Sequence, residues 1–168
     1  MTRPVPAVAA VVSLTLILLS GCTGEDATAP PTIPSSVDEL PTMDAATFSQ
    51  LLENERGTPV LVNIWASWCT PCQVETPELV RAHGVWGDRV RFIGVDAQDD
   101  RSGAVAFLSD HRVTYPSVFD PANDIAVSFG LFSPPATLFF DAEGTLVKTV
   151  PSQISEHDLR ANLRAITS

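Results

Sequence analysis

The chain has 168 residues, with 10 Lys or Arg against 20 Asp or Glu and a formal net charge of −10. This acidic balance argues against binding a nucleic-acid backbone or gripping an anionic membrane surface, because both need clustered basic side chains. The length suits one domain with a short additional segment.

The first residues are typical of a targeting signal. Arg3 precedes an apolar stretch over residues 5–19, which is shorter than the about 20 residues of a membrane-spanning helix. The following Leu-Ser-Gly-Cys, ending at Cys22, resembles the lipobox of bacterial lipoproteins. This resemblance implies that residues 1–21 are a signal peptide and that Cys22 is acylated as the first residue of the mature protein. A plain secretory signal with a chance cysteine is the alternative.

Residues 22–43 contain four prolines among small and acidic residues, which predicts a semi-extended, lipid-anchored tether. Residues 44–168 are expected to form one α/β domain. Apolar runs and turn signals predict strands over 60–65, 90–95, 117–119, 137–140 and 145–150, and helices over 44–55, 70–83, 103–111, 123–129 and 156–166. This alternation predicts a sheet covered by helices on both faces.

The cysteine count limits the chemistry further. Without Cys22, only Cys69 and Cys72 remain, so any disulfide within the mature domain joins these two. Such a bond is better interpreted as redox-active than as structural. Cys69 is predicted at a helix N-terminus, where free N–H groups and the helix dipole favour a thiolate. Cys72 and Glu75 follow on the same helix face, at i+3 and i+6.

Residues 65–77, which read Trp-Ala-Ser-Trp-Cys-Thr-Pro-Cys-Gln-Val-Glu-Thr-Pro, resemble the active-site signature of the membrane-tethered, thioredoxin-like disulfide oxidoreductases of the ResA, TlpA and CcmG group. The resemblance covers about residues 43–167. It implies a thioredoxin fold, with a central mixed sheet, helices on both faces and an added N-terminal helix. It also implies that Cys69 attacks a substrate disulfide and that Cys72 resolves the mixed disulfide.

The resemblance gives Glu75 a role as well, because the family's glutamate at this place lies close to the thiols and tunes their proton affinity. The alternative is a solvated helix residue. Asn63 stands where thioredoxin itself carries a buried aspartate, and an amide cannot accept that proton, which favours Glu75 as the acceptor. Trp65 is expected to pack, whereas Trp68 is expected to shield the active sulfur and offer a flat surface to partners.

The segment from Gly130 to Asp141 resembles the family's loop with a cis-proline opposite the cysteines, with Pro135 as the cis residue. Pro134 departs from the family pattern because it has no N–H to donate to a bound peptide, which predicts a weaker grip on extended substrates. Phe132 is either an exposed apolar contact or a core residue. The residues expected to contact substrate are Trp68, Thr70, Pro71, Pro134 and Pro135.

Other uses of the cysteine pair fit poorly. Gln73 follows Cys72 where covalent haem attachment needs a histidine, and the three histidines lack the spacing of zinc ligands. We therefore expect no metal and no cofactor beyond the Cys69–Cys72 disulfide. A binding lipoprotein or metal chaperone on the same fold is the less favoured alternative.

The expected function is a thiol–disulfide oxidoreductase, anchored as a monomer on the outer face of the cytoplasmic membrane. By resemblance it acts as a reductant that keeps the thiols of exported proteins, such as apocytochrome c, reduced for haem attachment, and it is recharged by a membrane thiol–disulfide carrier. An oxidant that inserts disulfides into exported proteins is the main alternative, because the same dithiol can run in either direction according to its potential.

Overall fold

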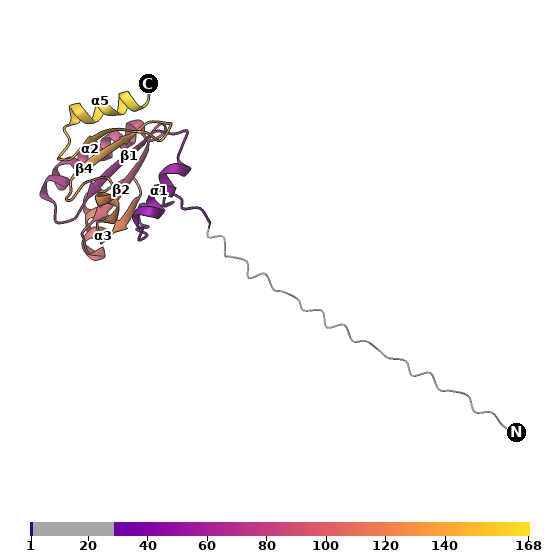
Figure 1. The fold of residues 1–168 in the computed structure, drawn as a ribbon. Helices are drawn as coiled ribbons and strands as arrows, with labels where there is room; N and C mark the ends of the chain where they lie inside the picture. The colour runs from indigo at the N-terminus through magenta and orange to yellow at the C-terminus, as the bar shows by residue number, and fades with distance from the viewer. Residues whose placement is uncertain (2–28) are drawn as a thin grey trace.

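The computed structural model describes Met1 and residues 29–168, so the expected signal peptide, Cys22 and the first part of the expected tether lie outside the described residues. Its centre is a five-stranded sheet in the order β3-β2-β1-β4-β5 (Figure 1). The strands are β1 (Val60–Trp65), β2 (Arg91–Ala97), β3 (Ser117–Asp120), β4 (Ala136–Phe140) and β5 (Leu146–Val150). β1 pairs in parallel with β2 and antiparallel with β4, so the predicted mixed sheet is confirmed.

Helices cover both faces of this sheet. They are α1 (Ala45–Asn54), α2 (Thr70–Trp86), α3 (Arg101–Asp110), α4 (Asp124–Ser128) and α5 (Glu156–Ile166). Buried residues of α2, α3 and α5 share one hydrophobic cluster with one face of the sheet, and those of α1 and α4 share a second cluster with the other face. The expected architecture, including the added N-terminal helix, is therefore present.

The central strand β1 carries the site. All six of its residues are buried, as expected for a strand covered on both faces. The parallel strands β1, β2 and β3 end at the same edge of the sheet, and the turn after Trp65 leads directly into α2. The edge strand β5, in contrast, is largely exposed.

Several element boundaries differ from those predicted. α2 continues three residues beyond His83 to Trp86, where Gly87 caps it by donating its N–H to the carbonyl of His83 (2.8 Å). β2 extends to Ala97, because the parallel pairing with β3 continues through Ala97 and Asp120. α3 begins at Arg101, two residues before the predicted start, because Asp100 is its N-cap.

The segment preceding α1 lies on the domain in its described part. Ile33 packs against the cluster beneath α1 and α4, and Leu40 and Met43 are buried. Thr42 pairs with Phe119 beside β3, which gives that edge of the sheet an additional partner. Part of the segment that the sequence assigns to the tether therefore contacts the folded domain.

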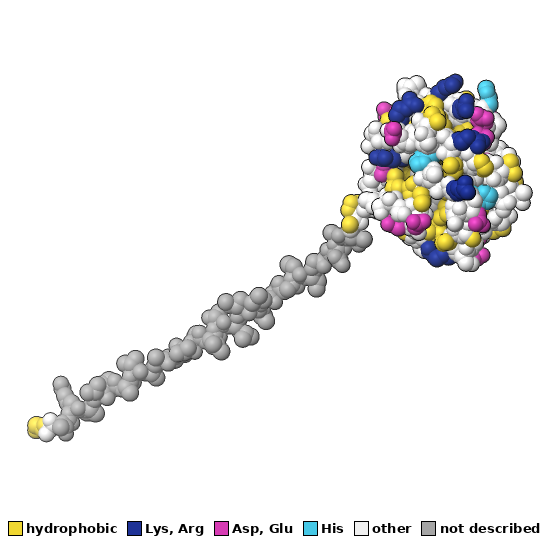
Figure 2. Space-filling model, turned by 180° about the vertical axis from the view of Figure 1, so that it is seen from behind, with side chains coloured by type: hydrophobic (Ala, Val, Ile, Leu, Met, Phe, Trp, Pro, Cys, Tyr) yellow, Lys and Arg dark blue, Asp and Glu magenta, His cyan; other side chains and the backbone are white. Residues whose placement is uncertain are grey.

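Charged side chains of both signs are interspersed over the face seen in Figure 2, without a large area of either. No helix among the described residues is long and apolar enough to cross a membrane.

Candidate active site

The two cysteines lie at the junction between the end of β1 and the start of α2. Cys69 is the N-cap residue of α2, and its Sγ accepts the N–H of Cys72 at 3.2 Å. Pro71 occupies the first turn, where its missing N–H removes no helical hydrogen bond. The cysteines form the predicted disulfide. Cys69 is 3% exposed and Cys72 is fully buried, so Cys69 is the cysteine nearer solvent and the one that a partner reaches first.

Glu75 lies one helical turn beyond Cys72 on the buried face of α2 and is only 1% exposed. Its Oε1 accepts a hydrogen bond from Nδ2 of Asn63 (2.9 Å), and its Oε2 accepts one from the backbone N–H of Ile154 (2.8 Å). Burial raises the pKa of Glu75 to about 7, although both hydrogen bonds favour the ionised form. Glu75 is thus a buried carboxyl that can change its charge near neutral pH, not a solvated helix residue.

The hydrogen bonds of Glu75 extend to residues that sequence reasoning missed. Oδ1 of Asn63 accepts a hydrogen bond from the hydroxyl of Tyr115, with an O–O distance of 3.3 Å. Burial, and then the charge of Glu75, raise the pKa of Tyr115, so this hydroxyl stays protonated and remains a donor. Tyr115 precedes β3 and Ile154 precedes α5, and nothing in their local sequence marks them as neighbours of a carboxylate on α2.

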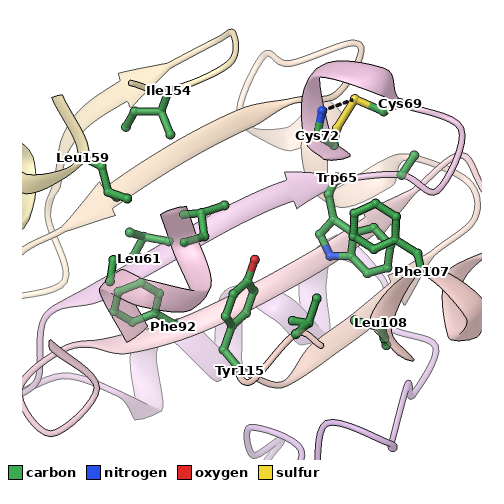
Figure 3. Close-up of a cluster of buried hydrophobic side chains, with 14 of the residues drawn as sticks. Leu61, Trp65, Cys69, Cys72, Phe92, Phe107, Leu108, Tyr115, Ile154 and Leu159 are labelled. Carbon is green, nitrogen blue, oxygen red and sulfur yellow. Dashed lines mark hydrogen bonds between the residues drawn. A yellow bond between two sulfur atoms is a disulfide. The ribbon is translucent and has the colours of Figure 1, made fainter. Parts of the chain in front are cut away.

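Trp65 packs beneath the redox pair, as predicted. It is 2% exposed and stacks on Phe107 of α3, with ring centroids 4.5 Å apart. Figure 3 shows this stack next to the Cys69–Cys72 disulfide. The indole of Trp65 therefore links the end of β1 to α3 and supports the turn from below.

Two exposed aromatic side chains belong to the loops around the cysteines. Trp68 is 54% exposed and Phe132 is 74% exposed, so Phe132 is a surface residue and not a core residue. Gln98 joins their loops, because its carbonyl accepts the indole N–H of Trp68 (2.9 Å) and its amide donates to the carbonyl of Phe132 (3.0 Å).

The loop after Phe132 contains the predicted cis-proline. The Pro134–Pro135 bond is cis, as expected from the sequence. Pro135 is buried and Pro134 is half-buried, whereas Thr70 and Pro71 beside the cysteines are exposed. The contacts that these residues are expected to make with substrate stay predictions, as does the acylation of Cys22.

The turn before Cys69 is held by a loop that the sequence did not single out. Asp99 accepts hydrogen bonds from both the backbone N–H and the hydroxyl of Ser67, the latter at 2.9 Å. Asp99 and Gln98 follow β2 at the carboxyl edge of the parallel strands, where functional residues of α/β sheets commonly gather. That edge rule is the signal that could have identified them. Within the described residues, no group of three or more His, Cys, Asp or Glu side chains is placed to hold a metal ion.

A comparison with family models matches residues 38–149 to the AhpC/TSA family. The chain belongs to this family. Within it, the chain is a thioredoxin-like thiol–disulfide oxidoreductase similar to the DsbE and ResA proteins.

Three relatives of this AhpC/TSA-family chain illustrate the similarity. The thiol:disulfide interchange protein DsbE homolog of Paracoccus denitrificans is 33% identical over 126 residues, which cover 70% of this chain and 68% of that protein. The structure of MTB dsbF has a TM-score of 0.65 and 27% identity over 68% of this chain and 85% of that one. A secreted disulfide oxidoreductase of Mycobacterium tuberculosis, homologous to E. coli DsbE, has a TM-score of 0.62 and 23% identity over 67% and 85%.

The AhpC/TSA-family chain covers only part of several curated relatives. The matched regions span 68%, 49% and 56% of three such proteins. The region that matches the family model, residues 38–149, includes the cysteine pair, the strands β1 to β4 and all of β5 except its last residue.

Proposed function

We propose that this oxidoreductase works outside the cytoplasm as a reductant of exported proteins, with the disulfide of oxidised apocytochrome c before haem attachment as a candidate substrate. The observation that carries the proposal is the buried carboxyl of Glu75, one turn from Cys72 and bonded to Asn63 and Ile154. The similarity to a DsbE homolog and to a secreted disulfide oxidoreductase supports the compartment.

The charge of Glu75 favours the reducing direction. An oxidant such as DsbA is strong because its reduced form is stabilised, and the thiolate contributes to that stabilisation. The N-terminus of α2 favours a thiolate at Cys69, whereas ionised Glu75 on the same helix disfavours a thiolate at Cys72. A reduced form that is stabilised less gives up its electrons more readily.

The reaction we propose starts from the reduced pair. The Cys69 thiolate attacks a substrate disulfide, forms a mixed disulfide and releases one substrate sulfur as a thiolate. Glu75 accepts the proton of the Cys72 thiol, and the Cys72 thiolate then attacks Sγ of Cys69. The second substrate sulfur leaves, and the chain ends with the Cys69–Cys72 disulfide. Two electrons pass to the substrate, and a membrane thiol–disulfide carrier returns two electrons to the chain.

Anchoring through Cys22 completes the proposal. Acylation of Cys22 after removal of residues 1–21 would keep a monomeric domain on the outer face of the cytoplasmic membrane. Mass spectrometry of the N-terminal peptide from the membrane fraction tests this directly. We expect diacylglycerol on Cys22, and release of the Cys22→Ala protein from the membrane. An unmodified N-terminus beginning elsewhere would refute the anchor without affecting the redox proposal.

The direction of electron flow is decided by the reduction potential of Cys69–Cys72, measured at equilibrium with glutathione at pH 7. We expect a value near that of thioredoxin, about −270 mV, and a value near that of DsbA, about −120 mV, would support the oxidant instead. A disulfide-bonded peptide with the Cys-x-x-Cys-His pattern of apocytochrome c serves as substrate. The Cys69→Ser protein is the control and must lose the reduction of this peptide.

A further inference from the structure

A second buried carboxyl lies at the carboxyl edge of β2 and has no part in the reaction above. Asp96 is 0% exposed, and neither of its oxygens has a hydrogen-bond partner within the described part of the chain. The parallel register places it between Trp65 of β1 and Phe119 of β3. A carboxylate in such surroundings is costly unless it is paired, so the position favours a protonated side chain.

The charges around Asp96 act in the same direction. Burial is the main cause that raises the pKa of Asp96 to about 8, and the negative charges of Asp99 and Asp100 add to it, against the opposing charge of Arg101. Asp100 is engaged as the N-cap of α3, where it accepts the N–H of Gly103 at 2.9 Å. The guanidinium of Arg101 instead donates to the carbonyl of Leu40 and lies over the ring of Phe119, 4.4 Å from its centroid.

Protonation of Asp96 gives it a partner. Two carboxylates cannot donate to each other, but a protonated Asp96 can donate its O–H to Asp99, whose negative charge is among the causes that raise the pKa of Asp96. Asp99 in turn accepts both the N–H and the hydroxyl of Ser67. With Asp96 protonated, a hydrogen bond to Asp99 would extend the observed contact between Asp99 and Ser67 into β2.

The packing around Ser67 and Asp99 is close. A side chain at Gly103 would place its Cβ 2.6 Å from the hydroxyl oxygen of Ser67, so the first turn of α3 lies directly against the Ser67 turn. Gln98, which lies in the same loop as Asp99, is hydrogen-bonded to both Trp68 and Phe132. A displacement of the loop over residues 98–100 would therefore move both loops around the cysteines.

We propose that Asp96 is a positioning residue that, when protonated, holds Asp99 against Ser67 and so keeps the turn before Cys69 in its reactive geometry. Loss of the proton adds a second negative charge to this region. That charge repels Asp99 and weakens its hydrogen bonds with Ser67. It also adds a negative charge opposite Trp65, at the end of the strand that leads into the Cys69 turn, and we expect this charge to disfavour the Cys69 thiolate. Both effects lower the reactivity of Cys69 as the pH rises through the titration of Asp96.

The proposal is tested by NMR on the full-length protein in its oxidised form, in which neither Cys69 nor Cys72 titrates. We expect the Ser67 amide resonance to shift between pH 5 and 10 in one step with a midpoint near 8, together with the carboxyl carbon of Asp96. The step should vanish in Asp96→Asn, whose amide can still donate to Asp99, and persist in the matched control Glu75→Gln. A Ser67 step that survives in Asp96→Asn, or an Asp96 carboxyl that titrates below pH 5, would overturn the proposal.

A kinetic readout on the reduced protein distinguishes positioning from a structural role. We expect the ratio of Cys69 alkylation rates, Asp96→Asn over the unaltered chain, to rise severalfold between pH 6 and 9. A merely structural effect would change the rate by the same factor at every pH, and a constant ratio would count against the proposal. If Asp96→Asn does not fold, the carboxyl titration of the unaltered protein still decides the matter.

Discussion

Nδ2 of Asn63 donates a 2.9 Å hydrogen bond to Oε1 of Glu75, so the strand that precedes the cysteines and the helix that follows them share one buried polar contact. Oδ1 of the same amide accepts a hydrogen bond from the hydroxyl of Tyr115. An amide suits this place because it donates and accepts at once, which a carboxylate cannot do. The residue that replaces thioredoxin's aspartate therefore orients Glu75 instead of exchanging a proton itself.

Replacing Asn63 by Asp tests this relationship. The substitution removes the donor to Glu75 and places a second carboxyl beside it in a buried site, where two negative charges disfavour each other. We expect the two carboxyls to titrate as a coupled pair with one apparent pKa well above the value of about 7 of Glu75 in the unaltered chain. Carboxyl ¹³C NMR of the oxidised protein measures this shift. An unchanged Glu75 titration in Asn63→Asp would contradict the contact.

Replacing Glu75 by Gln is expected to alter the reaction through its pH dependence. The glutamine side chain keeps the size and one acceptor oxygen but cannot take the proton of Cys72. We expect the steady-state rate of disulfide reduction at pH 7 to fall by about 100-fold, the lower end of general-base contributions, and its inflection near pH 7 to disappear. The initial alkylation rate of Cys69 serves as the internal control, because it does not require deprotonation of Cys72. A pH profile identical to that of the unaltered chain would remove Glu75 from the mechanism.

The same carboxyl makes folding stability depend on pH. The pKa of Glu75 is about 7 in the folded chain against 4.5 when unperturbed, so the native state binds more protons than the unfolded state between these values. Stability must then fall as the pH rises from about 4.5 to 7, by on the order of 3 kcal/mol for this one group. Urea unfolding of the oxidised chain at several pH values measures the decline.

The control for this measurement is urea unfolding of the Glu75→Gln protein, which lacks the titrating carboxyl. Asp96 contributes a decline of the same sign that continues toward pH 8, so the informative quantity is the difference between the two stability curves. We expect this difference to change across pH 4.5 to 7 and to stay constant above it. A difference that is flat over the whole range would show that the carboxyl titrates normally.

Much of this site could be predicted from local sequence, because its reactive part is contained in one strand, one turn and one helix. Helical periodicity alone places Cys69, Cys72 and Glu75 on one face of α2, and all three are buried there. The partners of Glu75 could not be predicted in this way. Tyr115 is separated from Asn63 by 52 positions and Ile154 from Glu75 by 79, so these contacts depend on how β3 and α5 dock on the sheet.

The contact between Asp99 and Ser67 illustrates the same limit. A run of acidic residues after a strand normally indicates a solvated loop, and Asp99 becomes a partner of the Cys69 turn through the parallel pairing of β1 and β2. Asp96 is harder still to interpret from sequence. Its burial results from the extension of β2 by pairing with β3, which local residue patterns do not reveal.

Truncating Trp65 to Ala is expected to destabilise the domain more than any surface change. The substitution removes a buried indole and its stack on Phe107, and buried aromatic-to-alanine changes cost about 3–5 kcal/mol. Val85→Ala on α2 is the control, because Val85 is 69% exposed and exposed substitutions usually stay within about 0.5 kcal/mol. Thermal and urea unfolding of both variants measure the difference. Equal stabilities would mean that the stack carries little packing energy.

The exposed side chains of Trp68 and Phe132 are expected to bind the partner protein without taking part in the chemistry. Their loops are joined through Gln98 beside the cysteines, and exposed aromatic residues at such places often dominate binding energy. We expect Trp68→Ala and Phe132→Ala each to raise the KM for a protein disulfide about 10-fold, equivalent to about 1.4 kcal/mol, with kcat nearly unchanged. Val147→Ala, on the edge strand β5 and 49% exposed, should leave both constants unaltered. A fall in kcat at constant KM would instead place the aromatic side chains in the chemical step. An equal rise in KM for Val147→Ala would show that the loss of binding is not specific to the surface formed by Trp68 and Phe132.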